Sequence, residues 1–141
     1  MNKKDEILRC ALEIVSLKGM DALTLNSLSE AVGLSKASMY HYFSSKEEII
    51  SQMLDMGHRN IMKNGFLLDL SGEPKDVLEK AAEKWENMFL DEDNWHFLRA
   101  VFSLHLSFPK AQDEYRSLFL MLSSQASVII SSFNTDQEKK R

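Results

Sequence analysis

A short segment near the N-terminus, residues 35–46, concentrates side chains that can form hydrogen bonds with the edges of bases. Lysine can donate to guanine O6 or N7, and serine can donate or accept. Tyrosine hydroxyls and a histidine ring add donors for bases or phosphates. These residue types therefore favour nucleic-acid recognition.

Helical phase separates a buried face of this segment from an outward face. At about 100° per residue, Met39 and Phe43 point together into a core, and His41 points nearly opposite. The outward face and its edges carry small, polar or aromatic side chains: Lys36, Ala37, Ser38, Tyr40, His41 and Tyr42. An ordinary solvated helix would be more highly charged. A packing role for the two tyrosines is the alternative interpretation.

Two short helices are predicted to position this face. Thr24 is a good N-cap for the first helix, and Gly33 ends that helix. Ser35 can cap the second, which is expected to run to Phe43. Two short helices joined by a three-residue turn are typical of a helix-turn-helix, whose second helix enters the major groove.

The rest of the chain is predicted to be helical, which makes the fold class all-α. Apolar residues recur at helical spacing, and only 2 prolines and 5 glycines occur among 141 residues. The expected longer helices are Lys3–Lys18, Ser45 to about Gly65, Pro74–Phe89, Trp95–His105 and Tyr115–Phe133. A polar tail, Asn134–Arg141, follows.

Charge is unevenly distributed along the chain. The net charge is −4, yet residues 1–47 are neutral, with six basic and six acidic side chains. Non-specific affinity of one such unit for DNA should therefore be modest. The single cysteine, Cys10, indicates a reduced compartment. We expect a cytoplasmic protein with no membrane segment, because no secretory leader or long apolar run is present.

The stretch LTLNSLSEAVGLSKASMYHYFSSKEEII, residues 23–50, resembles the signature of the TetR family of transcriptional regulators. The resemblance implies a helix-turn-helix DNA-binding domain over residues 1–47 and a helical ligand-binding and dimerisation domain over 48–141. It implies base contacts by Lys36, Ala37, Ser38, Tyr40 and His41, and phosphate contacts by Thr24, Tyr42 and Lys46. Asn26 departs from the family, which often has a basic residue there.

The function implied is that of a repressor that acts as a homodimer on double-stranded operator DNA and is released by a small-molecule ligand of unknown identity. Family members usually carry about two more helices, which commonly form the dimer interface. Either this chain is a short member, or C-terminal helices are missing from it. The exposed side of residues 118–133 is the remaining candidate interface.

Large or polarisable residues on predicted inward faces of the second half are candidates for a ligand pocket: Trp85, Met88, Phe89, Trp95, Phe102, His105 and Phe119. For each one alone, ordinary core packing is the favoured alternative. His96 and His105 lack the spacing of metal ligands, so neither a metal nor a cofactor is expected.

A competing class of protein is a helical protein-interaction module that does not bind DNA, and the neutral charge of residues 1–47 supports it. An enzyme is not expected, because the sequence has no glycine-rich phosphate loop and no recognisable catalytic set.

Overall fold

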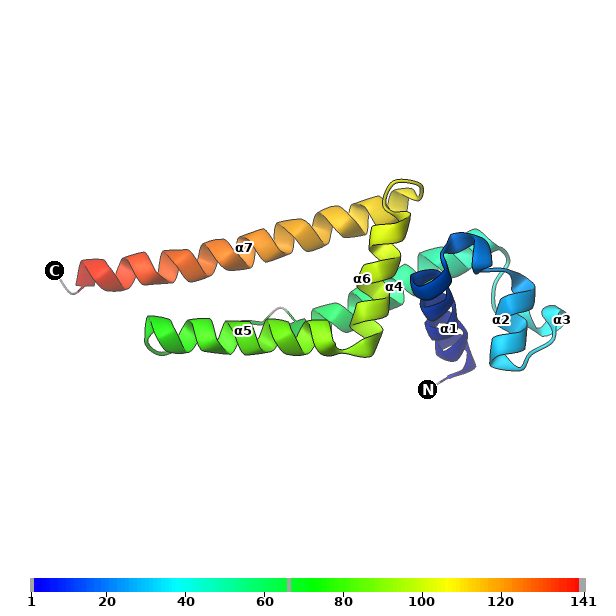
Figure 1. Ribbon diagram of the computed structural model, residues 1–141, viewed down its shortest axis with the longest axis horizontal. Helices are drawn as coiled ribbons and strands as arrows, with labels where there is room; N and C mark the ends of the chain where they lie inside the picture. Colours follow the sequence, from blue (N-terminus) through cyan, green and yellow to red (C-terminus); the bar gives the residue numbers. More distant parts are fainter. Residues whose placement is uncertain (1, 66, 140–141) are drawn as a thin grey trace.

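The computed structural model describes residues 2–65 and 67–139, without side-chain detail for 64–65 and 134–139. All regular elements in this part of the chain are helical (Figure 1). They are α1 (Lys3–Lys18), the 3-10 turn η1 (Met20–Ala22), α2 (Leu25–Val32), α3 (Lys36–Met39), α4 (Lys46–Gly65), α5 (Pro74–Leu90), α6 (Glu92–Leu104) and α7 (Pro109–Lys139). The all-α prediction is confirmed.

Local capping explains where the N-terminal helices begin. Asn2 accepts a hydrogen bond from the Asp5 backbone N–H at the start of α1. At α2, the Thr24 side chain accepts from the backbone N–H of Ser27, whose hydroxyl oxygen in turn accepts from the Thr24 N–H. Such caps satisfy backbone donors that the first helical turn leaves free.

The tight turn between α2 and α3 depends on Gly33. Its backbone is left-handed, with φ 68° and ψ 34°, a conformation that glycine adopts without a steric penalty. The Gly33 and Leu34 N–H groups donate to carbonyls near the end of α2. The predicted helix-turn-helix is therefore present.

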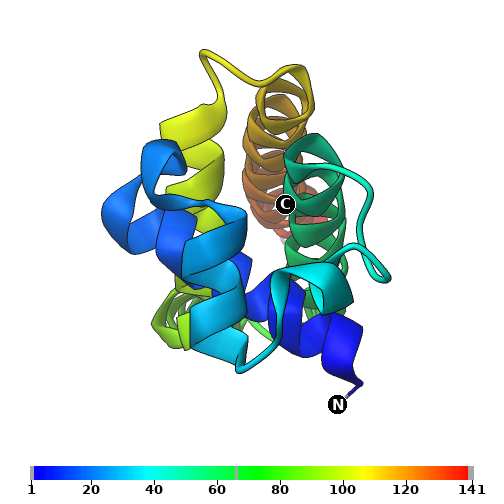
Figure 2. The same cartoon turned by 90° about the vertical axis from the view of Figure 1, so that its right-hand side faces the viewer.

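The helices form an elongated molecule. Figure 2 views it from the end that carries α1, α2 and α3. Helix α4 leads from this end toward α5 and α7, which extend away side by side, and α6 crosses beside α1 and α4 (Figure 1). One continuous apolar core joins the N-terminal helices to α4, α6 and the start of α7.

Helices α4 and α6 approach each other closely at Gly57. A Cβ atom added at Gly57 would lie only 2.6 Å from Cγ of Phe97, and Phe97 is fully buried. Gly57 therefore allows the ring of Phe97 to pack directly against the backbone of α4.

Several boundaries differ from those expected from the sequence. Regular α3 ends at Met39 rather than Phe43, although the following turns keep Phe43 N–H bonded to the Met39 carbonyl. Asp91 caps α6, so the expected break at 91–94 is only one residue. Pro109 occupies the first turn of α7, where its missing N–H costs no hydrogen bond. Helix α7 continues into the expected polar tail as far as Lys139, and residues 140–141 lie outside the described part.

The prediction of which α6 residues face inward is wrong. The buried face is rotated from the predicted one by about one residue position. Trp95 and Phe102 are 48% and 62% exposed, whereas Phe97, Val101 and Leu104 are buried. Phe89 on α5 and Phe119 on α7, also expected to face inward, are 43% and 64% exposed. Both sides of α6 are apolar, and packing against α1 and α4 selects the Phe97 side.

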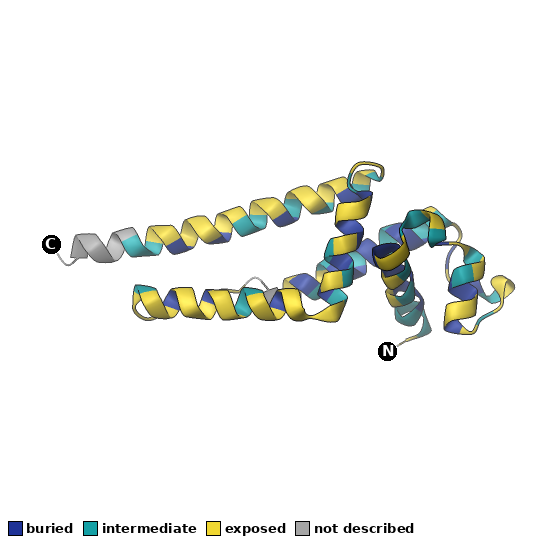
Figure 3. Ribbon diagram, in the orientation of Figure 1, coloured by how far each residue is buried: buried dark blue, intermediate teal, exposed yellow. Residues whose placement is uncertain are grey.

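Helix α5 is mainly exposed, and so is α7 as far as residue 133 (Figure 3). Their exposed apolar side chains include Leu78, Leu90, Leu120, Val128 and Ile130. None of the described helices combines the length and hydropathy needed to span a bilayer.

We predict that Gly57→Ala lowers the free energy of unfolding by about 1–3 kcal/mol, because the added methyl group overpacks against Phe97. Urea unfolding followed by circular dichroism measures this change. In a Phe97→Ala background the ring is gone and only the contact with the Cβ atom of residue 97 at 3.0 Å remains, so the same substitution should cost clearly less. Equal destabilisation in both backgrounds would contradict the packing argument.

Candidate nucleic-acid interface and apolar groove

The recognition segment, residues 35–43, presents most of its predicted base-facing side chains to solvent. Lys36, Ala37, Tyr40 and His41 are exposed, and Tyr40 is 59% exposed. Ser38 is half-buried, and its hydroxyl lies 2.8 Å from that of Ser35. The structure thus leaves four of the five predicted base-facing side chains exposed and the fifth half-buried.

Buried anchors set the rotation of this segment. Met39 is fully buried and Phe43 is 2% exposed, as their helical spacing predicts. Ser35 Oγ accepts from the Ser38 N–H at 3.0 Å and caps α3. The ammonium group of Lys4 lies 5.5 Å from the centroid of the Phe43 ring, within the range of a cation–π contact.

A carboxylate holds the turn between the recognition segment and α4. Glu48 Oε2 accepts from the backbone N–H of Ser44 at 2.7 Å and from its hydroxyl at 2.6 Å. Ser45 Oγ in turn accepts from the Glu48 N–H at 3.1 Å. The hydrogen bonds from Ser44, first from its side chain and then from its backbone, lower the pKa of Glu48.

The three predicted phosphate-binding residues lie around the same end of the molecule. Thr24 is exposed at the N-terminus of α2, and Tyr42 is 36% exposed in the turn after α3. Lys46 opens α4, and its ammonium group donates to the Met20 carbonyl at 3.1 Å. Asn26, which departs from the family pattern, is exposed on α2. Helix N-termini such as these favour phosphate through free N–H groups and the helix dipole.

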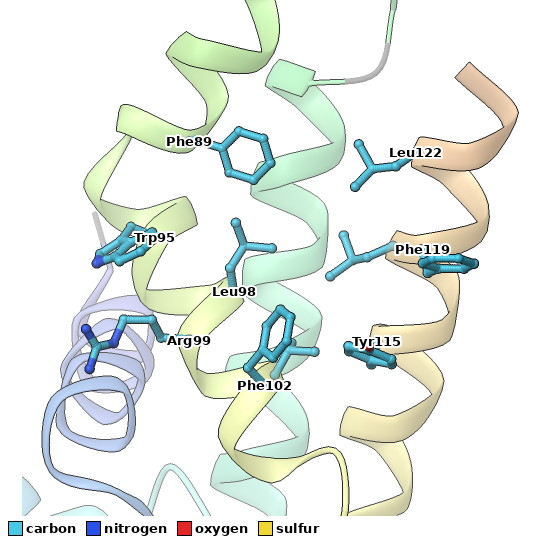
Figure 4. Close-up of a pocket in the computed structure, with 10 residues that line it drawn as sticks. Phe89, Trp95, Leu98, Arg99, Phe102, Tyr115, Phe119 and Leu122 are labelled. Atoms are coloured by element: carbon cyan, nitrogen blue, oxygen red, sulfur yellow. The ribbon is translucent and has the colours of Figure 1, made fainter. Parts of the chain in front are cut away.

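An apolar groove of about 470 Å³ lies between α5, α6 and α7 (Figure 4). Most of its lining is aromatic or aliphatic: Phe89, Trp95, Leu98, Arg99, Val101, Phe102, Tyr115, Leu118, Phe119 and Leu122. Its volume lies within the range of small-molecule sites. Four of the predicted pocket residues line it: Phe89, Trp95, Phe102 and Phe119.

The other three predicted pocket residues lie outside this lining. Trp85 donates through Nε1 to Gln125 at 2.9 Å, and Met88 is buried in the core. His105 ends α6, with Nδ1 2.6 Å from the Phe102 carbonyl and its ring stacked on Tyr115 at 4.7 Å. Packing and hydrogen bonding within the protein, rather than a place in the groove lining, therefore describe these three residues.

Sequence reasoning left several lining residues out of the candidate set. Leu98 lies one turn beyond Trp95, and Tyr115, Leu118 and Leu122 follow one stripe of α7. Their helical spacing was an available signal. No pattern in the sequence could have identified Arg99 as a lining residue, because its position depends on packing between segments that are distant in sequence.

Ionisable side chains do not gather into a metal site in residues 2–65 and 67–139, where no group of three or more His, Cys, Asp or Glu has suitable geometry. The one free cysteine, Cys10, is half-buried, and burial raises the pKa of its thiol, with Glu13 and Glu6 adding to the shift.

Residues 7–53 match the family model of bacterial regulatory proteins, tetR family. Over 93% of its length, the chain superposes on the TetR family regulator PfmR from Thermus thermophilus, with a TM-score of 0.71 and 26% identity, covering 70% of that chain. The N-terminal third of the chain is thus similar to the DNA-binding region of TetR family regulators.

A second relative and a second solved structure are also similar to this chain. The HTH-type transcriptional repressor KstR2 of Mycobacterium tuberculosis strain H37Rv is 26% identical over 87 residues, which are 62% of this chain and 39% of the repressor. The chain thus spans about two fifths of that relative's length. A proposed transcriptional regulator from Saccharomonospora viridis, crystallised in complex with choline, shares the fold, with a TM-score of 0.69 and 17% identity over 94% of this chain and 70% of that one.

We predict that Glu48→Gln loosens the turn that precedes α4 without unfolding the protein, because an amide oxygen accepts more weakly than a carboxylate. Amide hydrogen exchange of residues 43–46 should quicken. Because the folded-state pKa of Glu48 is lowered, its contribution should be present at neutral pH and be lost as pH falls through that pKa. Glu47→Gln, on the preceding residue of α4, is the control and should leave exchange unchanged.

Proposed function

We propose that this chain is a TetR family regulator, a sequence-specific DNA-binding repressor that is released from its operator by a small-molecule ligand. One observation supports the DNA-binding part of this proposal. Met39 and Phe43 are buried, and the side chains around Lys36, Tyr40 and His41 are left exposed on one surface. The repressor relative supports the same regulatory class.

Contacts with DNA divide into two groups in this proposal. Lys36, Ala37, Ser38, Tyr40 and His41 read base edges in the major groove. Thr24, Tyr42 and Lys46 hold the flanking phosphates and so set the position of the recognition segment. The Lys46 ammonium group has three N–H donors, so it can keep its bond to the Met20 carbonyl, which positions it, and also donate to a phosphate oxygen.

The second half is proposed to bind a ligand and to dimerise. The groove beside α6 is the ligand site, and the choline complex of the Saccharomonospora viridis protein shows that one solved chain of this fold takes a small molecule. Exposed apolar residues of α7 outside the groove, Leu120, Val128 and Ile130, form the dimer surface. Residues 1–47 and 48–141 remain our proposed division of these roles, and regulation of chromosomal DNA would place the protein in the cytoplasm.

A helical interaction module without DNA binding is the alternative, and no observation favours it over the DNA-binding proposal. The exposed recognition face is the feature on which the two differ. A direct test with DNA therefore decides between them.

We predict that Lys46→Ala weakens DNA binding about equally for all sequences and reduces the slope of log affinity against log salt by about 1 per site, because one phosphate contact is lost. Mobility shift at several salt concentrations, with a duplex selected by the wild-type protein from a random pool, measures this. Lys75→Ala, on α5, removes an equal charge far from the recognition segment and should change neither quantity. If wild type binds no duplex at low salt, the DNA-binding proposal fails.

We predict a different result for Ser38→Ala, which removes a group that can bond to a base. Binding to the selected duplex should weaken by about 1–3 kcal/mol, the usual range for one base contact, while non-specific binding stays unchanged. Competition with unrelated duplex DNA separates the two. An equal loss on both kinds of DNA would contradict a base-reading role, and thermal unfolding checks that α3 remains folded.

A further inference from the structure

Three polar contacts join α1, in the N-terminal domain, to α6, beside the groove. Arg9 pairs with Asp93 at 2.7 Å. Ser16 Oγ lies 2.5 Å from His96 Nδ1. Arg99 Nε donates to the Ser16 carbonyl at 3.1 Å, across 83 residues of sequence.

The bond from Arg99 stabilises the C-terminal end of α1. Carbonyls in the last turn of a helix have no intrahelical donor, and a cation there interacts favourably with the helix dipole. The Ser16 carbonyl lies in that last turn, which ends at Lys18. Shortly after this turn, the Met20 carbonyl accepts a hydrogen bond from the ammonium group of Lys46. The end of α1 is therefore close in the chain to a proposed phosphate contact.

Arg99 also lies beside the groove. Its guanidinium carbon is 5.9 Å from the centroid of the Trp95 ring, and both residues line the cavity. Figure 4 shows the two side chains on the same flank of α6, turned away from α7, while Phe89, Leu98 and Leu122 point into the groove. One side chain thus contacts both the groove wall and α1.

The chemistry of the lining selects the class of ligand. Five rings line the groove: Phe89, Trp95, Phe102, Tyr115 and Phe119. No carboxylate belongs to the lining, and the guanidinium of Arg99 is directed toward α1. An uncharged aromatic molecule meets these requirements, because it stacks on rings and needs no buried ion partner.

We infer that Arg99 is a positioning residue that couples occupancy of the groove by an uncharged aromatic ligand to the C-terminal end of α1. A ligand that packs against Trp95 shifts the indole from beneath the guanidinium. Arg99 then loses one of its two supports, and its bond to the Ser16 carbonyl opens. The end of α1, the turn η1 and the Met20 carbonyl that holds Lys46 are loosened together.

This inference deepens the proposed function and rests on it for its regulatory meaning, but its test does not require DNA. The probe is N-phenyl-1-naphthylamine, an uncharged aromatic dye whose fluorescence rises in apolar sites. Phe102→Ser should weaken its binding at least about fivefold, since one wall of the groove becomes polar. Amide hydrogen exchange of residues 16–23 reports on the end of α1.

In wild type, saturating dye should raise exchange in residues 16–23 by about fivefold, the change produced by loss of roughly one net hydrogen bond. Arg99→Met keeps the aliphatic stem but removes the donors. Its exchange should already be raised without dye and should not rise further when dye binds. The matched control is Arg9→Met, which removes another bridge between α1 and α6 whose residues do not line the groove. This variant should keep the full response to dye.

The inference is overturned if the dye does not bind, or if it binds wild type without changing exchange in α1. It is equally overturned if Arg99→Met responds as wild type does, or if Arg9→Met loses the response to the same extent. A mobility shift measured in parallel keeps the two proposals separate. Absence of DNA binding with intact coupling refutes only the proposed function, and DNA binding without coupling refutes only this inference.

Discussion

Burial of Met39 and Phe43 determines which side of the recognition segment reaches solvent. The two side chains lie one helical turn apart, so both can enter the core only at one rotation of the segment. Ser35 fixes the beginning of α3, and Glu48 holds the turn that leaves the segment. A small number of anchored residues thus present the polar and aromatic face, in a chain whose first 47 residues carry no net charge.

The same core extends from the recognition segment to the groove. Helix α4 carries the turn held by Glu48 at one end and Gly57 further along, where Phe97 of α6 packs against its backbone. The opposite side of α6 lines the groove. A shift of α6 cannot therefore be absorbed locally, because close-packed interiors transmit displacement. Hydrogen bonds and an ion pair between α6 and α1 form a second connection to the N-terminal helices.

Much of the fold was predictable because local signals agreed with one another. Helix α1 was expected at Lys3–Lys18 and lies there, since one apolar stripe runs its full length. Placement of the recognition face followed from helical phase alone. Its contacts with DNA remain predictions.

The groove was only partly predictable. Both sides of α6 are apolar, so periodicity could not decide between the Phe97 side and the Phe102 side, and tertiary packing made the choice. His105 and Trp85 have the composition of pocket residues but are bonded elsewhere. Arg99 is placed by a hydrogen bond to a residue 83 positions away, and no local pattern in the sequence reports such a contact.

Backbone amide shifts of the protein, recorded by NMR as a selected duplex is added, show directly whether the recognition segment contacts DNA. We expect the largest changes at Thr24, at the residues from Lys36 to Tyr42, and at Lys46. Changes confined to α5 and α7, or none at saturating duplex, would contradict recognition of DNA by this face.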